Sequence, residues 1–187
     1  IGADETAWGN PPVTRALISK VRSEGFRSIR IPVTWEGRQG AAPDYPIDPA
    51  WLAKVRQTVD WAMAEGLYVM INLHHDSWMW INQLATDHDA VLSRYNATWT
   101  QLGATVRDAS KRLVFESVNE PTFSATTGDD QNYLLLNELN TAFHRVVRAS
   151  GGGNATRLLV LPTLYTNADQ PRLDALATSL TDLGDPM

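Results

Sequence analysis

A predicted strand that ends in an amide and a carboxylate is the clearest place for chemistry in this sequence. Residues 113–118 (Leu-Val-Phe-Glu-Ser-Val) are mostly apolar, and Asn119-Glu120-Pro121 follows them. Pro121 disfavours a helical backbone at Glu120 and should hold it extended, so that the carboxyl points off the strand end. That end of a strand faces the ligand in α/β folds, which favours a catalytic role over a solvated loop acid. Glu116 should lie on the same side but deeper, and is a weak alternative.

Other predicted strands also carry or precede polar and aromatic groups. Arg30 lies in the strand predicted at 28–33, His74 and His75 follow the strand at 67–73, and Tyr165 follows the strand at 157–161. An arginine between two isoleucines must find buried partners or line a polar cavity, although a surface ion pair is the simpler alternative. Chemistry assembled from several strand ends is typical of (β/α)8 barrels.

The segment His74-His75-Asp76 could also indicate a metal site, since imidazole and carboxylate are common ligands. Adjacent side chains on a strand point to opposite faces, so at most one of these histidines should face a given site. The other histidines, His88 and His144, fall on or near predicted helices. We therefore expect no metal and no other cofactor. Metal-dependent hydrolysis that uses one of the paired histidines, Asp76 and Glu120 stays an alternative.

Three tryptophans, Trp35, Trp78 and Trp80, lie in predicted loops. They could be hydrophobic lids. They could equally form a platform for sugars, because flat indole faces suit the apolar C–H faces of pyranose rings.

The elements that position these groups alternate between strand and helix. Apolar spacing and capping residues predict helices at about 12–24, 48–65, 92–106 and 133–150, and one led in by Asp169. Each lies next to a single predicted strand, which indicates a parallel sheet with right-handed crossovers, either doubly wound or closed into a barrel. No glycine-rich phosphate loop follows a strand, which argues against a nucleotide-binding sheet.

Composition excludes several classes. The 187 residues suit one domain, and 16 Lys+Arg against 21 Asp+Glu give a net charge of −5 with no basic run. We therefore expect neither a nucleic acid nor a membrane as partner, and a neutral or weakly cationic ligand. The absence of cysteine excludes disulfides, thiolate catalysis and cysteine-bound zinc.

Four segments, taken together and in order, resemble the cellulases of glycoside hydrolase family five. They are residues 5–11 (ETAWGNP), Gly25-Phe26 with 29–35 (IRIPVTW), 72–76 (NLHHD) and 119–121 (NEP). The resemblance covers nearly the whole chain. It implies a fold of the (β/α)8 TIM-barrel type and hydrolysis of glycosidic bonds with retention.

The resemblance implies a role for each matching residue. Glu120 would be the general acid/base, Asn119 the partner of the substrate 2-hydroxyl, and Arg30 the cation that holds the nucleophile, while His74 matches a histidine of the family's third strand. Retaining hydrolysis needs two carboxyls about 5–5.5 Å apart, so Glu120 can be only one of them. The expected substrate-binding residues are His75, Trp35, Trp78, Trp80, Trp8 and Tyr165.

The family's nucleophilic glutamate follows its seventh strand, and a His and Tyr pair ends its sixth, yet we count only strands two to five here. We therefore expect residues 1–187 to be a single partial barrel without the first strand and the last three βα units. Another segment or chain would supply the remainder, and the start at Ile1 suggests a processed or cut terminus. This chain alone should be inactive.

The expected activity is cleavage of internal β-1,4 bonds in cellulose-type glucans. The family resemblance also implies secretion. A β-mannanase or another β-glycanase of the same clan is the alternative enzyme, and a non-catalytic glucan-binding half-barrel is the alternative from another class.

Overall fold

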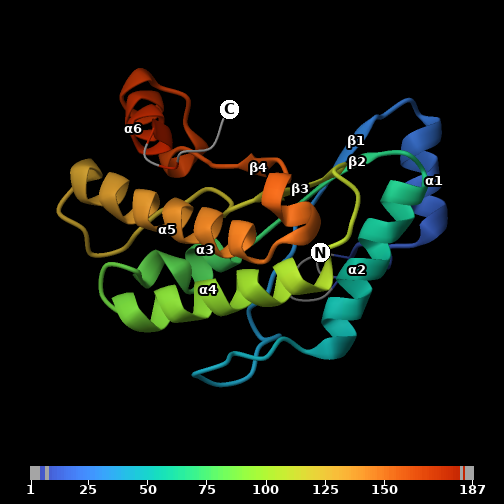
Figure 1. Ribbon diagram of the computed structural model, residues 1–187, viewed down its shortest axis with the longest axis horizontal. Helices are drawn as coiled ribbons and strands as arrows, with labels where there is room; N and C mark the ends of the chain where they lie inside the picture. The colour runs from blue at the N-terminus through green and yellow to red at the C-terminus, as the bar shows by residue number, and fades with distance from the viewer. Residues whose placement is uncertain (1–4, 7–8, 182, 184–187) are drawn as a thin grey trace.

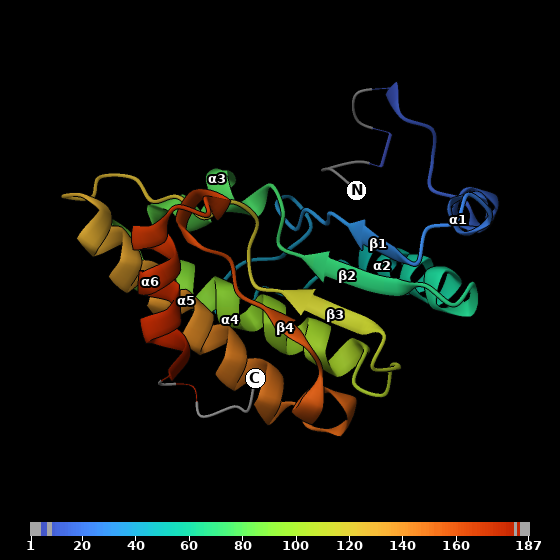
Figure 2. The same cartoon turned by 90° about the horizontal axis from the view of Figure 1, so that it is seen from above.

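The computed structural model describes residues 5–6, 9–181 and 183, in which four strands form one parallel sheet. The strands lie side by side in sequence order and run in the same direction (Figure 2). They are β1 (Ser28–Ile31), β2 (Tyr68–Asn72), β3 (Leu113–Glu116) and β4 (Leu159–Val160). Each falls inside a predicted strand. The predicted strands ran longer because apolar residues continue into the loops.

The predicted helices are all present, and one long helix lies between each pair of successive strands. They are α1 (Arg15–Ser23), α2 (Pro49–Ala64), α4 (His88–Thr105), α5 (Asp129–Ala149) and α6 (Gln170–Thr181). The first helix begins later than the predicted residue 12, because the Thr14 hydroxyl caps α1 by accepting a hydrogen bond from Leu17 N. Four shorter turns of helix complete the described chain: α3 (Asp76–Met79), η2 (Ile81–Gln83), η3 (Gly152–Thr156) and η4 (Leu164–Thr166).

The core lies between one face of the sheet and helices α2, α4 and α5 (Figures 1 and 2). Trp99 of α4 packs between Phe115 of β3 and Phe143 of α5, with ring centroids 5.3 and 4.5 Å apart. Val69 of β2 is fully buried on this side, whereas Tyr68 points to the other face and is 56% exposed. Among the described helices, none covers that second face. Tyr68 is therefore open to solvent on that face, whereas Asn72 and Glu116, further along it, are buried by contacts with other side chains.

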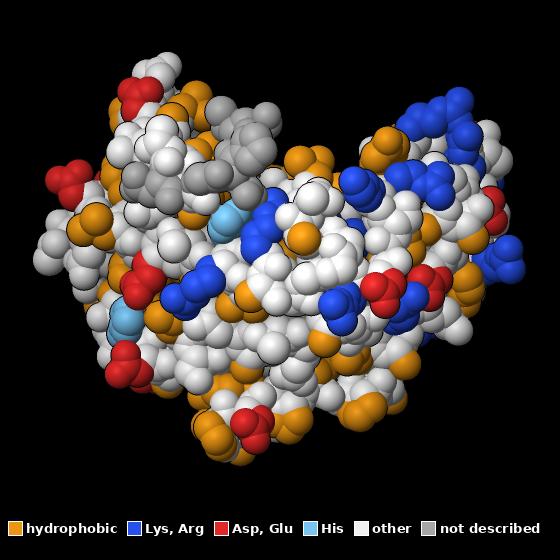
Figure 3. Space-filling model, in the orientation of Figure 1, with side chains coloured by type: hydrophobic (Ala, Val, Ile, Leu, Met, Phe, Trp, Pro, Cys, Tyr) orange, Lys and Arg blue, Asp and Glu red, His pale blue; other side chains and the backbone are white. Residues whose placement is uncertain are grey.

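The surface view is hollowed between the end of the molecule that carries α6 and the end that carries α1, with Lys and Arg gathered on the α1 side (Figure 3). No helix in the described part of the chain has the length and hydropathy that crossing a bilayer requires. The prediction that no strand precedes β1 concerns residues 1–8. Of these, 1–4 and 7–8 lie outside the described residues.

Candidate active site

Polar side chains at the carboxyl ends of β1, β2 and β3 form one hydrogen-bonded network. The Arg30 guanidinium extends across β2 and donates two hydrogen bonds to Glu116. They run from Nε to Oε2 at 2.7 Å and from Nη2 to Oε1 at 2.9 Å. The same Nη2 donates to Asn119 Oδ1 at 2.8 Å. The Glu116 side chain is 9% exposed, so its charge is buried and paired by two parallel bonds. Arg30 therefore finds the buried partner that its position demands.

Asn72, at the end of β2, connects this pair to His74. Its Nδ2 donates to Glu116 Oε2 at 3.1 Å and to His74 Nδ1 at 3.3 Å, and its Oδ1 accepts from Val33 N at 3.4 Å. Because His74 Nδ1 accepts, the imidazole proton lies on Nε2. In the sequence Asn72 is simply the polar interruption of an apolar strand, and its bridging role was missed.

The two histidines lie side by side, with ring centroids 4.8 Å apart. The prediction that only one could face the site is wrong, because β2 ends at Asn72 and strand alternation ends with it. His75 Nδ1 contacts Thr34 Oγ1 at 2.7 Å, and the His75 ring lies 4.9 Å from that of Trp78. Burial, followed by the charge of Arg30, lowers the pKa of His74 to about 4, and burial lowers the pKa of His75. Both rings are thus neutral near pH 7.

The depressed pKa of His74 predicts a pH dependence of stability. Between about pH 4 and 6.5 the unfolded chain binds more protons at His74 than the folded chain, so this group makes the free energy of unfolding fall as the pH drops through that window. We expect His74→Asn to flatten the slope, measured as urea midpoints across the window. An unchanged slope would show that His74 titrates normally.

His88 gives a control of opposite sign. Hydrogen bonds to Asp89 and Glu138 raise its pKa, so its contribution is present at low pH and is lost as the pH rises through that raised value. His88→Gln should therefore remove stability at the acid end, where His74→Asn adds it.

Glu120 is exposed, but its backbone is not extended as predicted. Its φ is +40°, in the left-handed region that few non-glycine residues adopt. Pro121 disfavours the right-handed helical region at Glu120, but the extended backbone that it favours is not adopted. Hydrogen bonds on both sides fix the turn: Asn119 N donates to Leu73 O, and Tyr165 N donates to Pro121 O, each at 2.9 Å. Strain of this kind, about 1–3 kcal/mol, collects at functional sites.

The turn also breaks the alternation expected along this segment. Glu116 and Asn119 both reach Arg30, while Val118 is fully buried. Glu116, which received little weight in the sequence, is thus central to the network. A buried acid on the face that carries Arg30 was the signal that could have found it.

Two of the predicted tryptophan platforms are wrong. Trp35 is fully buried, and its Nε1 donates to Asn72 O at 3.3 Å. Trp80 is 7% exposed and lies beneath the Arg94 guanidinium, 4.3 Å from the ring centroid. Neither offers a free face, because each loop folds inward around a buried acceptor. Trp78 and Tyr165 are 47% and 43% exposed, and Trp8 lies outside the described residues.

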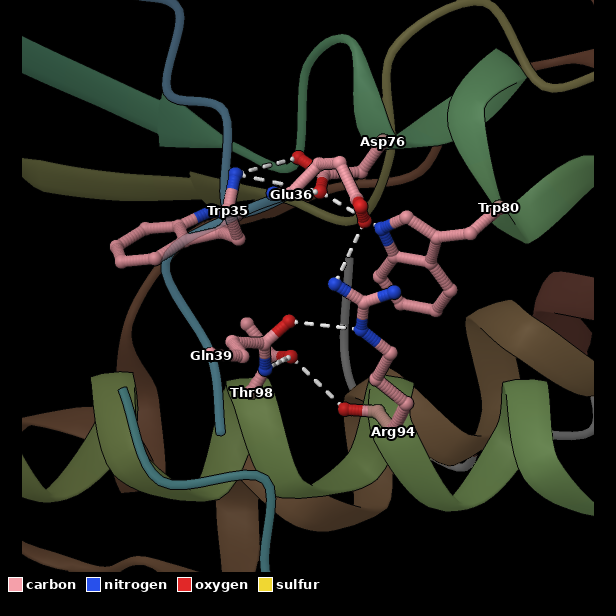
Figure 4. Close-up of polar contacts among 7 residues, drawn as sticks. All are labelled: Trp35, Glu36, Gln39, Asp76, Trp80, Arg94 and Thr98. Atoms are coloured by element: carbon pink, nitrogen blue, oxygen red, sulfur yellow. Dashed lines mark hydrogen bonds and ion pairs between the residues drawn. The ribbon is translucent and has the colours of Figure 1, made fainter. Parts of the chain in front are cut away.

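Asp76 is that buried acceptor for the loops after β1 and β2 (Figure 4). It accepts hydrogen bonds from Trp35 N at 2.9 Å, Glu36 N at 2.9 Å and Trp80 Nε1 at 2.8 Å. Burial raises its pKa, and the hydrogen bonds from Trp35 and Trp80 oppose that rise. Within the described residues, no three His, Cys, Asp or Glu side chains are grouped so as to hold a metal ion.

Comparison with known families identifies the family to which this chain belongs. Residues 2–183 match the family model described as cellulase, glycosyl hydrolase family 5. The chain belongs to glycosyl hydrolase family 5. The sequence is 50% identical to endoglucanase B of Paenibacillus lautus, over 99% of this chain and 33% of that protein.

Two solved structures of this family resemble the chain. One is the full-length tri-modular endo-β-1,4-glucanase B from Bacillus halodurans, 53% identical with a TM-score of 0.95, over 100% of this chain and 35% of that one. The other is XEG5A, a xyloglucan-specific endo-β-1,4-glucanase from a metagenomic library in complex with cellotriose. It is 37% identical with a TM-score of 0.86, over 91% of this chain and 52% of that one.

The predicted fold class is confirmed. Family 5 enzymes are (β/α)8 barrels, and the four parallel strands with their helices match part of such a barrel. The chain spans about a third of the length of the first two relatives.

Proposed function

We propose that the protein containing this chain is a retaining endo-β-1,4-glucanase and that residues 28–121 form one wall of its cleft. The observation that carries the proposal is an exposed Glu120 next to the Arg30–Glu116–Asn119 cluster in a family 5 chain. The relatives named endoglucanase, and the cellotriose bound to XEG5A, support a β-1,4-glucan as substrate.

Glu120 is proposed to protonate the leaving oxygen and later to activate water. Retention requires a second carboxylate about 5–5.5 Å away as nucleophile. The negative charge of that group would help to keep Glu120 protonated until the substrate departs. As the family resemblance implies, the Arg30 guanidinium would face this nucleophile.

Asn119 and His74 are proposed to hold the sugar. Asn119 Oδ1 accepts from Arg30, which leaves its Nδ2 to donate to the substrate 2-hydroxyl. His74 presents its Nε2–H, because Asn72 donates to the other nitrogen. Trp78, beside His75, has an exposed indole that could stack on a neighbouring sugar ring.

Assays on the complete polypeptide test this function. Reducing ends should be released from carboxymethyl cellulose, with mannan and xylan as comparison substrates. Activity on mannan alone would make the protein a β-mannanase. Measurable affinity for cello-oligosaccharides without any turnover would make it a glucan-binding module. Loss of activity on chelation would favour the metal-dependent alternative.

Arg30→Lys should lower kcat by roughly 10²-fold with little change in KM, because a lysine cannot reproduce the paired bonds to Glu116 and the third bond to Asn119. Steady-state kinetics on a soluble β-glucan measure both constants. The matched control is Arg15→Lys on the exposed surface of α1, which should behave as the parent. An unchanged kcat in Arg30→Lys would remove Arg30 from the machinery.

Residues 1–187 alone are expected not to hydrolyse glucan. Two acids of this chain already have partners. Glu116 is paired with Arg30, and Asp76 accepts hydrogen bonds from three N–H donors. We therefore propose that the nucleophile and the rest of the barrel come from another segment or chain. An assay of the isolated chain, before and after addition of the missing βα units, measures this. Full activity of the isolated chain would contradict it.

The proposed substrate is a polymer too large to enter a cell. We therefore propose that the protein acts outside the cell, as the family resemblance implies.

A further inference from the structure

A cavity of about 220 Å³ lies between the loop after β1, the turn η2 and the first turns of α4. Its lining combines two aromatic residues, Tyr45 and Trp80, with three polar ones, Gln83, Asp87 and Arg94. None of these five belongs to the network around Glu120. The proposed catalytic function therefore gives this cavity no role.

Two residues of the lining, Trp80 and Arg94, are held in place by several contacts (Figure 4). Arg94 stacks on Trp80, and it is held from the other side by Gln39 Oε1 at 2.9 Å and Glu36 Oε2 at 2.8 Å. Trp80 is fixed in turn by its bond to the buried Asp76. A site whose groups are locked before binding loses little entropy when a ligand arrives.

A third lining residue, Tyr45, has a strained backbone. Its φ is +43°, in the left-handed region. Hydrogen bonds hold it there: Tyr45 N donates to Ala41 O at 3.1 Å, and Gln101 Nε2 of α4 donates to Tyr45 O at 3.0 Å. Such conformations persist in non-glycine residues only where the surroundings impose them, and they gather at binding sites.

The polar lining groups retain capacity for hydrogen bonds. Arg94 donates hydrogen bonds from Nε and Nη2 to described residues, and its Nη1 remains to donate to a ligand. Asp87 occupies the N-cap position of α4, yet its carboxylate makes no capping bond. Among the described residues, the Gln83 side chain likewise has no hydrogen-bond partner. The cavity thus offers a guanidinium, an amide and a carboxylate around two aromatic rings.

This chemistry fits a neutral sugar. Glu36 already neutralises the charge of Arg94, and Asp87 adds a negative charge. The cavity therefore has no net positive charge to attract an anion. The Tyr45 ring can contact an apolar C–H face of a pyranose, and the polar lining groups suit its hydroxyls, which both donate and accept. The volume is below that of sites for drug-sized ligands, which are about 300–1,000 Å³, and suits a single ring. We propose that this cavity binds one pyranose unit of a neutral glycan, as a second glycan site in addition to the proposed cleft.

The test follows the Trp80 indole N–H resonance while cellotetraose is added to the complete polypeptide carrying Glu120→Gln, which prevents hydrolysis. The resonance should shift. Tyr45→Asn removes the ring but tolerates the left-handed backbone, and should weaken the affinity reported at Trp80 by about tenfold. Tyr45→Phe keeps the ring and should leave it unchanged. Absence of a shift, or equal affinity in Tyr45→Asn, would overturn the proposal.

Two further measurements fix the class of ligand and the independence of the site. Oligogalacturonate, an acidic analogue, should bind at Trp80 more weakly than cellotetraose, and tighter binding would refute a neutral ligand. With Glu120 intact, Tyr45→Asn should hydrolyse an aryl cellobioside as the parent does. A large loss would make the cavity part of the cleft, which overturns a second site. Failure of the parent to hydrolyse any glucan would instead refute the proposed function.

Discussion

Glu120→Gln should reduce hydrolysis of unactivated β-glucan by roughly 10²- to 10⁴-fold, the usual contribution of general acid–base catalysis. Glutamine keeps the shape of the side chain and its strained turn at φ +40° but has no proton to give to the leaving oxygen. Initial rates of the complete polypeptide on a soluble glucan measure the loss. The free energy of unfolding should change little, because the Glu120 side chain is exposed.

The basicity of the leaving group distinguishes proton donation by Glu120 from a positioning role. An aryl cellobioside departs as a weakly basic phenolate and needs little protonation, so its first step should be much less affected in Glu120→Gln. Glu116→Gln is the useful contrast, since it disrupts the paired bonds to Arg30 and should slow both substrates alike. Equal loss on both substrates in Glu120→Gln would assign Glu120 a positioning role. No loss on either would remove it from the mechanism.

The sequence predicted those parts of the fold that depend on periodicity. Apolar runs of strand length located all four strands, and the polar groups in or after these strands placed Arg30, His74 and Glu120 at one end of the sheet. These groups lie together because all strands of a parallel sheet end at the same edge.

What the sequence did not predict depends on contacts between loops. A tryptophan in a loop reads as exposed, and only the position of Asp76 shows that Trp35 and Trp80 fold inward. The partnership of Arg30 with Glu116 spans two strands, so strand alternation alone could not select it from the other acids. Local patterns describe elements well, but pairings between distant side chains are set by tertiary packing.

Arg157 has the most extensive set of contacts that the sequence did not predict. It reads as the polar first residue of a predicted strand, yet its side chain is fully buried. Its five N–H groups meet five oxygens within 3.2 Å, one from a side chain and four from the backbone at the end of α4 and the start of β3. These acceptors are Asn154 Oδ1 and the carbonyls of Val106, Ala109, Ser110 and Leu113. The guanidinium also lies 5.1 Å from the centroid of the Phe115 ring.

Arg157→Met should therefore lower the free energy of unfolding by about 3–5 kcal/mol, since it leaves several buried carbonyls without donors. Burial lowers the pKa of Arg157, and the acceptors that stabilise its charge are oriented carbonyls and not a carboxylate. Urea midpoints followed by tryptophan fluorescence measure the effect. Activity at low temperature should survive, because Arg157 contacts no group of the proposed cleft.

Two variants make this prediction specific. Arg157→Lys keeps the charge but supplies three donors instead of five, so its stability should fall between those of the parent and Arg157→Met. Arg112→Met is the matched control: the Arg112 guanidinium donates from Nη2 to Met63 O at 3.2 Å, and the loss of this bond should cost about 1 kcal/mol or less. Equal stability of Arg157→Met and Arg112→Met would contradict the prediction. It would mean that water reaches the carbonyls that Arg157 contacts, and that the Arg157 guanidinium is not needed to hold α4 against β3.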